Sequence, residues 1–215
     1  MTQNKEEKKE TPKKEKILFA VDIEGSGALL SQHAIIAIGW CVGNMEGKIL
    51  EKKRVSLKIP FNKGFEVRCL EQYWKKDKTQ MLQLATFTTE AVDPETAMKT
   101  FIERVRFYDN DYDVSIVTDN PSYDIMWINY YLDVYLNHMP LNYYSDQASY
   151  RGITDPMNFG IRYKIKKDKD ETSFVFNKTK YFEEMDNFKK SGIHDHWPEN
   201  DAEGIYKKTL MICNL

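Results

Sequence analysis

The order of apolar segments in this sequence predicts an α/β protein with a mixed sheet flanked by helices. Residues 17–59 contain three β-prone segments separated by turn residues, and from residue 66 onward strands alternate with segments of helical periodicity. Such an order favours a mixed sheet covered by helices over a sandwich or a helix bundle. The 215 residues are enough for one domain with a full hydrophobic core.

The chain begins with a charged tail and a meander of three strands. Residues 1–16 interleave Lys and Glu and have almost nothing to bury, so they are expected to be disordered. The apolar run at residues 17–21 predicts a buried strand. Residues 33–42 and 48–59 predict two further strands that form an antiparallel hairpin around a glycine-containing turn. The folded domain is therefore expected to span residues 17–215.

Helices dominate the predictions for the rest of the chain. Residues 66–84 mix apolar and charged residues in a helical pattern, and Pro94 begins a second helix with apolar residues at helical spacing. Residues 114–118 predict another short buried strand. A short strand is also expected near residues 143–148, and the charged residues 164–176 are expected in an exposed loop or hairpin.

Two carboxylates, Asp22 and Glu24, follow the first predicted strand one residue apart. In a strand, residues i and i+2 point to the same face, with Cα atoms roughly 6.5 to 7 Å apart. Two like charges held that close favour a bound cation, and hard divalent ions such as Mg²⁺ or Mn²⁺ take oxygen ligands. The alternative is that both residues simply end the strand and face water.

Two later segments place acidic residues next to predicted helix starts. Asn120 can cap a helix whose first position suits Pro121, so Asp124 falls in its opening turn. There the carboxylate either reaches a site at the strand end or only complements the helix dipole. Pro198 suits the start of an amphipathic C-terminal helix. Asp201 then lies in its first turns and His196 just ahead of it, so one element can present an acid and an imidazole to the same site.

Three motifs, taken together, resemble the DEDDh family of 3′-to-5′ exonucleases. They are Asp22-Ile-Glu24, Asn120-Pro-Ser-Tyr123-Asp124 and His196-Trp-Pro-Glu-Asn-Asp201-Ala202. Their order and spacing carry the resemblance, which extends from Ile17 to the C-terminus. It implies a ribonuclease H-like fold with a mixed five-stranded sheet flanked by helices. One departure is Pro198, because family members more often have alanine two positions after the histidine.

The resemblance implies a phosphodiester hydrolase that releases nucleoside 5′-monophosphates from the 3′ ends of single-stranded DNA or RNA. It implies two Mg²⁺ or Mn²⁺ ions that promote in-line attack by water, with His196 as the general base. The implied metal ligands are Asp22, Glu24, Asp124 and Asp201. The expected substrate contacts are Gly25, Ser26, Gly27 and Trp197. The alternative is a catalytically weak nucleic-acid-binding or scaffold protein on the same fold, which four intact motif carboxylates argue against.

Composition narrows the class of protein further. The net charge of −2 provides no global positive field for nucleic acid, so any such binding depends on local groups and bound cations. Cys41, Cys69 and Cys213 are too few and too scattered for a zinc motif or a disulfide framework. No signal peptide or membrane-length apolar run is visible, so an intracellular, cytoplasmic protein without a membrane partner is expected. A homodimer and the choice between DNA and RNA stay open.

Overall fold

The computed structural model describes four parts of the chain. They are residues 14–141, 153–168, 178–190 and 195–214. Residues 1–13 of the expected tail at residues 1–16, the expected strand at residues 143–148 and the charged residues 169–176 lie outside the described residues. Lys16 was expected in the tail and instead begins the first strand.

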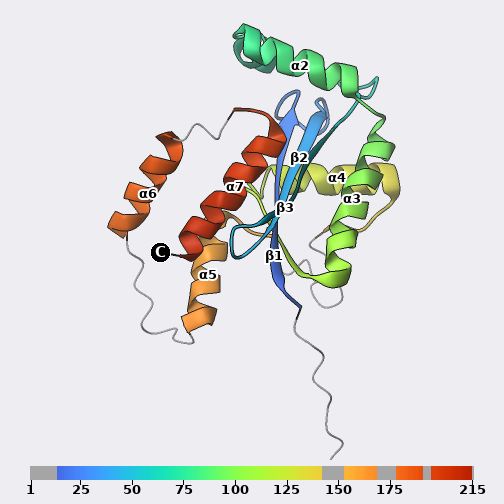
Figure 1. Ribbon diagram of the computed structural model, residues 1–215. Coiled ribbons are helices and arrows are strands. Elements are labelled where there is room, and N and C mark those ends of the chain that lie inside the picture. The colour runs from blue at the N-terminus through green and yellow to red at the C-terminus, as the bar shows by residue number, and fades with distance from the viewer. Residues whose placement is uncertain (1–13, 142–152, 169–177, 191–194, 215) are drawn as a thin grey trace, which may run out of the picture.

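A four-stranded mixed sheet forms the centre of the fold, in the order β3-β2-β1-β4 (Figure 1). The strands are β1 (Lys16–Gly25), β2 (Ile35–Asn44), β3 (Ile49–Ser56) and β4 (Asp113–Val117). β1 pairs antiparallel with β2 and parallel with β4, and β2 pairs antiparallel with β3. The three-stranded meander and the mixed character of the sheet are therefore confirmed.

The expectation of five strands is wrong for the described residues. Beyond β4, Thr154 forms a single isolated parallel bridge with Val117 at the edge where a fifth strand would join. The chain leaves this edge at once, because Asp155 accepts hydrogen bonds from the N–H groups of Met157 and Asn158 and begins a helix instead. A strand needs several consecutive pairs, and one bridge does not provide them.

Seven α-helices and one π-helical turn surround the sheet in the described parts of the chain. They are α1 (Val67–Cys69), the π-helical turn η1 (Leu70–Trp74), α2 (Lys78–Glu90), α3 (Pro94–Asp111), α4 (Asp124–Leu136), α5 (Pro156–Asp168), α6 (Lys178–Lys190) and α7 (Pro198–Cys213). α3 and α4 lie on one face of the sheet, α5 and α7 lie on the other, and α2 crosses one end of it (Figure 1). None of these helices is long and apolar enough to cross a membrane.

Two segments differ from the sequence-based expectation. Residues 66–84 were expected to form one helix, but the helix breaks after Trp74 and restarts at Lys78, because the Asp77 side chain accepts the N–H groups of Thr79 and Gln80 and caps a new helix. Residues 164–168 were expected in a loop or hairpin and instead form the end of α5. The predicted helices beginning at Pro94 and Pro198 are confirmed.

The core is divided by the alternation of side chains along β1. Ile17, Phe19 and Val21 pack with residues of α3 and α4, whereas Leu18 and Ala20 pack with residues of α5 and α7. All five side chains are fully buried. Burial of each of the four larger ones stabilises the folded state by roughly 1.5 to 3 kcal/mol. By the same alternation, Asp22 and Glu24 point toward α7.

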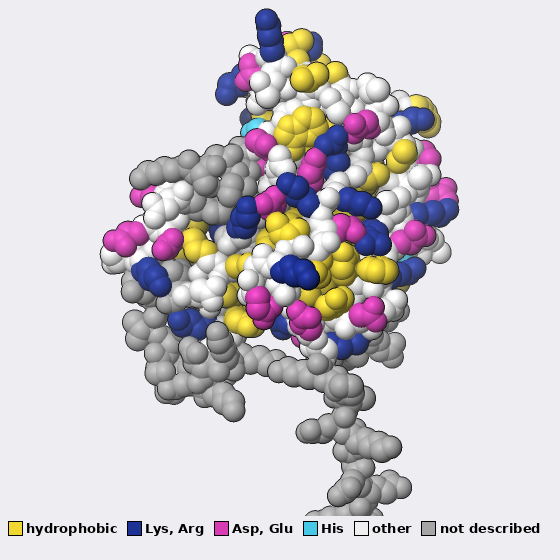
Figure 2. Space-filling model, in the orientation of Figure 1, with side chains coloured by type: hydrophobic (Ala, Val, Ile, Leu, Met, Phe, Trp, Pro, Cys, Tyr) yellow, Lys and Arg dark blue, Asp and Glu magenta, His cyan; other side chains and the backbone are white. Residues whose placement is uncertain are grey.

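Charges of both signs are interspersed over the visible face of the molecule rather than separated into patches (Figure 2). Many of them pair across elements, as Lys52 does with Glu203 and Arg54 with Glu199. The outer edge of β3 carries Lys52, Lys53 and Arg54, and charged side chains at an exposed sheet edge disfavour pairing with a second copy. This face therefore offers no patch of one charge that would attract nucleic acid by itself.

Candidate functional site

Asp22 and Glu24 lie at the end of β1, on the face of the sheet that α7 covers. Their positions follow Leu18 and Ala20 in the alternation of the strand, and their register partners on β2 are Gly39 and Ala37. Glu24 is only 8 % exposed. The apolar run that makes β1 a central strand thus carries two carboxylates into a poorly solvated position.

The start of α7 brings a third carboxylate and an imidazole to the same place. Asp201 accepts a hydrogen bond from the backbone N–H of Asp195 at 3.0 Å and another from that of His196 at 3.1 Å, one to each carboxylate oxygen. These bonds fold the loop back over the first turns of its own helix. His196 has a left-handed backbone conformation, with φ 62°, which a non-glycine residue adopts only where the surrounding structure imposes it.

Glu24, His196 and Asp201 converge, with one ligand atom of each within 4.8 Å of the others. His196 Nδ1 lies 3.7 Å from Glu24 Oε1. Glu24 comes from β1, whereas the other two come from the loop and first turns of α7. Two of the three predicted motifs therefore meet in space.

Asp124 begins α4 just beyond the end of β4 and is 4 % exposed. Its carboxylate accepts a hydrogen bond from the Thr118 hydroxyl. Asn120 acts through its backbone carbonyl, which accepts the N–H groups of Tyr123 and Asp124 at 2.9 Å, rather than as the expected side-chain cap. The helix consequently begins at Asp124 instead of at Pro121, and the carboxylate stays at its first position.

The four carboxylates interact electrostatically even though they come from three segments of the sequence. Burial raises the pKa of Asp22 well above its usual value, and the charges of Glu24, Asp124 and Asp201 raise it further. Burial raises the pKa of Glu24 to about 7, although the adjacent His196 imidazole opposes the rise. Burial also raises the pKa of Asp124 to about 6. The cluster therefore carries more negative charge than its surroundings can solvate.

The residues of this cluster fit a divalent cation. Hard ions such as Mg²⁺ and Mn²⁺ prefer carboxylate oxygens, and a cation would relieve both the mutual repulsion and the loss of solvation that raise these pKa values. The interaction with the Glu24 carboxylate is the first among the causes that raise the pKa of His196 above its usual value. The imidazole lies next to the carboxylates, although 30 % of its side chain is exposed.

A cavity of about 320 Å³ adjoins the cluster. Its lining residues are Gly25, Gly27, Ala28, Glu66, Arg68, Cys69, Gln72, Tyr73 and Tyr123. It lies beside the carboxylates because Gly25 follows Glu24 in β1 and the Tyr73 ring contacts the ring of His196. Burial, and next the charge of Glu24, raise the pKa of the Tyr73 phenol, so this side chain lies within the field of the cluster. Its size is that of a small-molecule site.

Residues 66–73 of this cavity were not found by sequence reasoning. The helical pattern there contains no recognisable motif, and its approach to β1 is a tertiary contact. The one local signal is the uncharged aromatic pair Tyr73 and Trp74 within a charged segment. The Trp74 indole N–H donates to the Gly25 carbonyl at 3.2 Å and so ties this segment to the end of β1.

The four expected substrate contacts divide into two pairs. Gly25 and Gly27 line the cavity. Ser26 is fully buried, and its hydroxyl donates to the Gly64 carbonyl at 2.7 Å and accepts the Ala34 N–H at 2.8 Å, so it holds two loops together and does not line the cavity.

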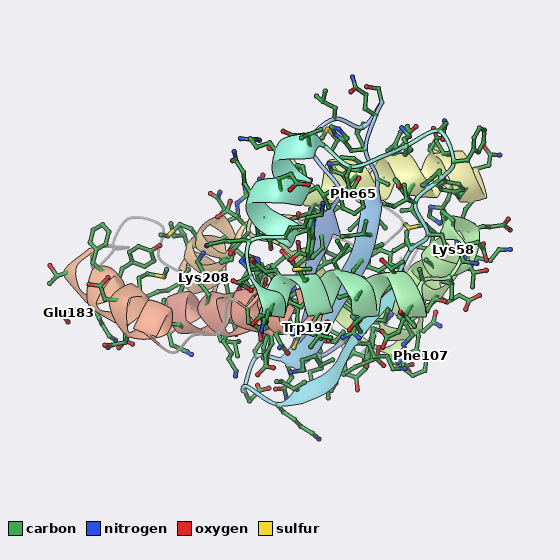
Figure 3. The ribbon with its side chains drawn as sticks, turned by 90° about the horizontal axis from the view of Figure 1, so that it is seen from above. Lys58, Phe65, Phe107, Glu183, Trp197 and Lys208 are labelled. Carbon is green, nitrogen blue, oxygen red and sulfur yellow. The ribbon has the colours of Figure 1, made fainter. Side chains whose placement is uncertain are left out.

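Trp197 is half-buried and lies beside α2 (Figure 3). Its ring meets Phe87 edge to face at 5.3 Å and lies 4.6 Å from the Arg54 guanidinium. The indole is therefore engaged within the protein, in contrast to the open stacking surface expected for it. Base stacking by Trp197 stays a prediction.

Comparison with known proteins gives matches at the level of structure alone. No protein-family model matches the sequence, and no curated protein matches it. Product-bound exonuclease I matches with a TM-score of 0.56 at 10 % identity, over 91 % of this chain and 42 % of that chain. The nuclease domain of 3′hExo, a DEDDh family member bound to rAMP, matches with a TM-score of 0.52 at 13 % identity, over 94 % and 92 %.

A third match is S. pombe Pop2p in its Mg²⁺- and Mn²⁺-bound form, with a TM-score of 0.53 at 13 % identity, over 90 % of this chain and 81 % of that one. This chain spans less than half the length of the exonuclease I chain. At these identities the matches show the fold, so the predicted likeness to DEDDh-family 3′-5′ exonucleases is confirmed for the fold. They give no support for a homodimer.

Proposed function

We propose that this protein is a metal-dependent 3′-5′ exonuclease that hydrolyses single-stranded DNA or RNA ends to nucleoside 5′-monophosphates. The observation that carries the proposal is the convergence of Glu24, His196 and Asp201 within 4.8 Å at the end of β1. Asp22 and Asp124 extend this cluster electrostatically. Three solved structures with a similar fold support the proposal. They are a product-bound exonuclease, an rAMP-bound nuclease domain and a protein bound to Mg²⁺ and Mn²⁺.

The role of the carboxylates in this proposal is to bind the metal ions. Asp22, Glu24, Asp124 and Asp201 would hold two Mg²⁺ or Mn²⁺ ions, which when bound neutralise charge on the phosphoryl oxygens and on the leaving 3′-oxygen. Thr118 fixes Asp124 by a hydrogen bond, and the backbone N–H groups of the His196 loop fix Asp201. Ligands oriented in this way lose little freedom when a cation arrives.

His196 would serve as the general base. Its Nδ1 faces Glu24 Oε1, so Nε2 is the nitrogen that would take the proton of the attacking water. The Glu24 carboxylate stabilises the imidazolium that results, which is consistent with the raised pKa of His196. The base and Asp201 belong to one loop and one helix start, so these two residues are positioned together.

The cavity next to the cluster would receive the terminal nucleotide. Gly25 and Gly27 present backbone without side chains, which allows close approach of the sugar. Arg68 and Gln72 offer hydrogen-bond donors in the same cavity, and Glu66 offers an acceptor. The volume accommodates one nucleoside and leaves the rest of a strand outside.

The proposal is tested with single-stranded oligonucleotides labelled at the 5′ end, as matched DNA and RNA sequences, with Mg²⁺ or Mn²⁺. We expect progressive shortening from the 3′ end, release of nucleoside 5′-monophosphates and complete loss of activity with a chelator. An oligonucleotide blocked at its 3′ end should resist cleavage. Stable retention of the oligonucleotide without shortening would instead identify a nucleic-acid-binding protein that keeps the fold without turnover.

A further inference from the structure

The rings of Tyr73 and His196 meet edge to face, with centroids 4.9 Å apart and planes at 87°. Tyr73 belongs to η1, and His196 belongs to the loop before α7. We propose that Tyr73 is a positioning residue for His196, because its ring fixes the orientation of the imidazole in the site. The catalytic consequence of this contact rests on the proposed exonuclease function, whereas the contact itself does not.

The contact of the imidazole with Glu24 does not by itself define the orientation of the ring. The 3.7 Å between His196 Nδ1 and Glu24 Oε1 exceeds a normal hydrogen bond and does not fix the ring by itself. The side chain of His196 is 30 % exposed, and its backbone has the left-handed conformation. A base displaced by about 1 Å loses as much as a hundredfold in rate, so the orientation of this ring matters.

Tyr73 is itself held by a rigid neighbour. The ring of Trp74 meets that of Tyr73 at 4.8 Å and 84°, and Trp74 is fully buried. The Trp74 indole donates to the Gly25 carbonyl, directly after Glu24. The Lys75 N–H closes the π-helical turn onto the Leu70 carbonyl at 2.9 Å, and such single π-helical turns are frequent at functional sites. Tyr73 is therefore fixed relative to the carboxylates.

The helix that follows η1, α2, holds both neighbours of His196. The Gln83 side-chain amide donates to the Asp195 carbonyl at 2.7 Å. On the other side, Phe87 contacts both Trp74, at 6.0 Å, and Trp197, at 5.3 Å. Figure 3 shows Trp197 lying beside α2, which supplies Gln83 and Phe87. The loop is thus held on both flanks, and Tyr73 adds the contact with the imidazole ring.

Two substitutions distinguish the role of the Tyr73 ring from the role of its hydroxyl. Tyr73→Leu removes the aromatic ring, and Tyr73→Phe keeps it. Tyr112→Leu is the matched control, because Tyr112 is also half-buried against another aromatic ring but precedes Asp113, whose register partner Lys16 begins β1 at the opposite end of the sheet. Thermal unfolding of all three variants verifies that they fold.

The first measurement is the NMR signal of the His196 imidazole in metal-free protein. The sequence contains four histidines, so the signal is assigned by its loss in His196→Ala. We expect Tyr73→Leu to change the nuclear Overhauser contacts between this imidazole and the neighbouring side chains, because the ring reorients, while Tyr73→Phe and Tyr112→Leu leave these contacts in place. Unchanged contacts of the His196 imidazole in Tyr73→Leu would overturn the proposal, whether or not the protein cleaves nucleic acid, because loss of the Tyr73 ring current alone shifts the signal without any reorientation.

The second measurement is single-turnover cleavage at saturating and limiting oligonucleotide. Mispositioning of the base should lower the rate at saturation in Tyr73→Leu about 10- to 100-fold, with rescue by Tyr73→Phe to within about threefold of the unaltered protein. A rise in KM with an unchanged saturated rate would identify Tyr73 as a lining residue only and contradict the proposal. If the unaltered protein does not cleave, the proposed function fails, and the nuclear Overhauser contacts still decide the positioning role.

Discussion

Gly39 of β2 lies beneath the first turn of α7 so closely that a Cβ atom built on it would come within 2.0 Å of the Pro198 carbonyl carbon. Gly39 is also the register partner of Asp22. A close contact between α7 and the sheet therefore lies beside the first carboxylate of the cluster. This contact places Asp201 near β1.

Replacement of Gly39 by alanine should displace α7 from the sheet. The added methyl group would meet backbone atoms of Pro198 and Glu199, which cannot rotate away. We expect a loss of about 1 to 3 kcal/mol or more in the free energy of unfolding, measured in urea, together with loss of cleavage. Gly64→Ala is the control, because a Cβ at Gly64 meets nothing within 4 Å. Equal stability of the two variants would contradict this account of the packing.

Replacement of Asp22 by asparagine should lower the activity and raise the stability of the metal-free protein. The variant loses a carboxylate of the cluster, so cleavage should fall by orders of magnitude. It also removes a buried charge that repels Glu24 and Asp124, so the metal-free protein should unfold at a higher temperature than the unaltered one. Asp133→Asn, an exposed change on α4, should alter neither quantity. Near-normal cleavage by Asp22→Asn would remove Asp22 from the site.

The affinity for divalent cations should rise with pH. The pKa of Glu24 is about 7 and that of Asp124 is about 6, and both lie above the usual values of these groups. At a pH between the usual pKa and the raised pKa of each group, the folded metal-free protein therefore binds more protons than the unfolded chain. Its free energy of unfolding should therefore fall as pH rises through this window. A cation must displace these protons, so Mn²⁺ should bind about tenfold or more tightly at about pH 7.5 than at about pH 6. Calorimetry in two buffers measures the protons released, and pH-independent binding would be inconsistent with this cluster.

Replacement of His196 by alanine should leave a folded protein with little activity. Loss of a general base lowers the rate by roughly 10²- to 10⁴-fold, whereas binding of the oligonucleotide should change little. Single-turnover cleavage and the melting temperature measure the two effects separately. The control is His138→Ala, whose imidazole contacts Arg106 and the Met139 carbonyl away from the cluster. Wild-type turnover in His196→Ala would show that this histidine is not the base.

Replacement of Thr118 by valine tests the support of Asp124. The change preserves the shape of a fully buried side chain and removes the hydroxyl that donates to the carboxylate. Loss of such a supporting hydrogen bond typically weakens metal binding or activity about 10- to 100-fold. The control is Thr209→Val. The Thr209 hydroxyl donates to the Ile205 carbonyl within α7, so its loss should leave Mn²⁺ affinity and cleavage unchanged. Comparable losses in both variants would argue for a general packing defect.

Sequence patterns predicted the mixed sheet and the helices at Pro94 and Pro198. The resemblance to the DEDDh family implied the acidic and imidazole residues of the site, of which Glu24, His196 and Asp201 converge. These features depend on local chemistry. Alternation along β1 sends Asp22 and Glu24 to one face, and the short spacing of His196 and Asp201 lets backbone N–H groups reach the carboxylate. Local periodicity is visible in sequence, so these elements could be derived from it.

Tertiary structure decided what local patterns do not encode. The contact of Tyr73 with His196, the use of Trp197 as a packing residue and the replacement of a fifth strand by one bridge at Thr154 depend on which distant segments pack together. Such contacts arise from shape and from satisfied hydrogen bonds between remote parts of the chain, and neither has a period along the sequence. The sequence by itself determined which groups could perform the chemistry, and only packing decided how they are held.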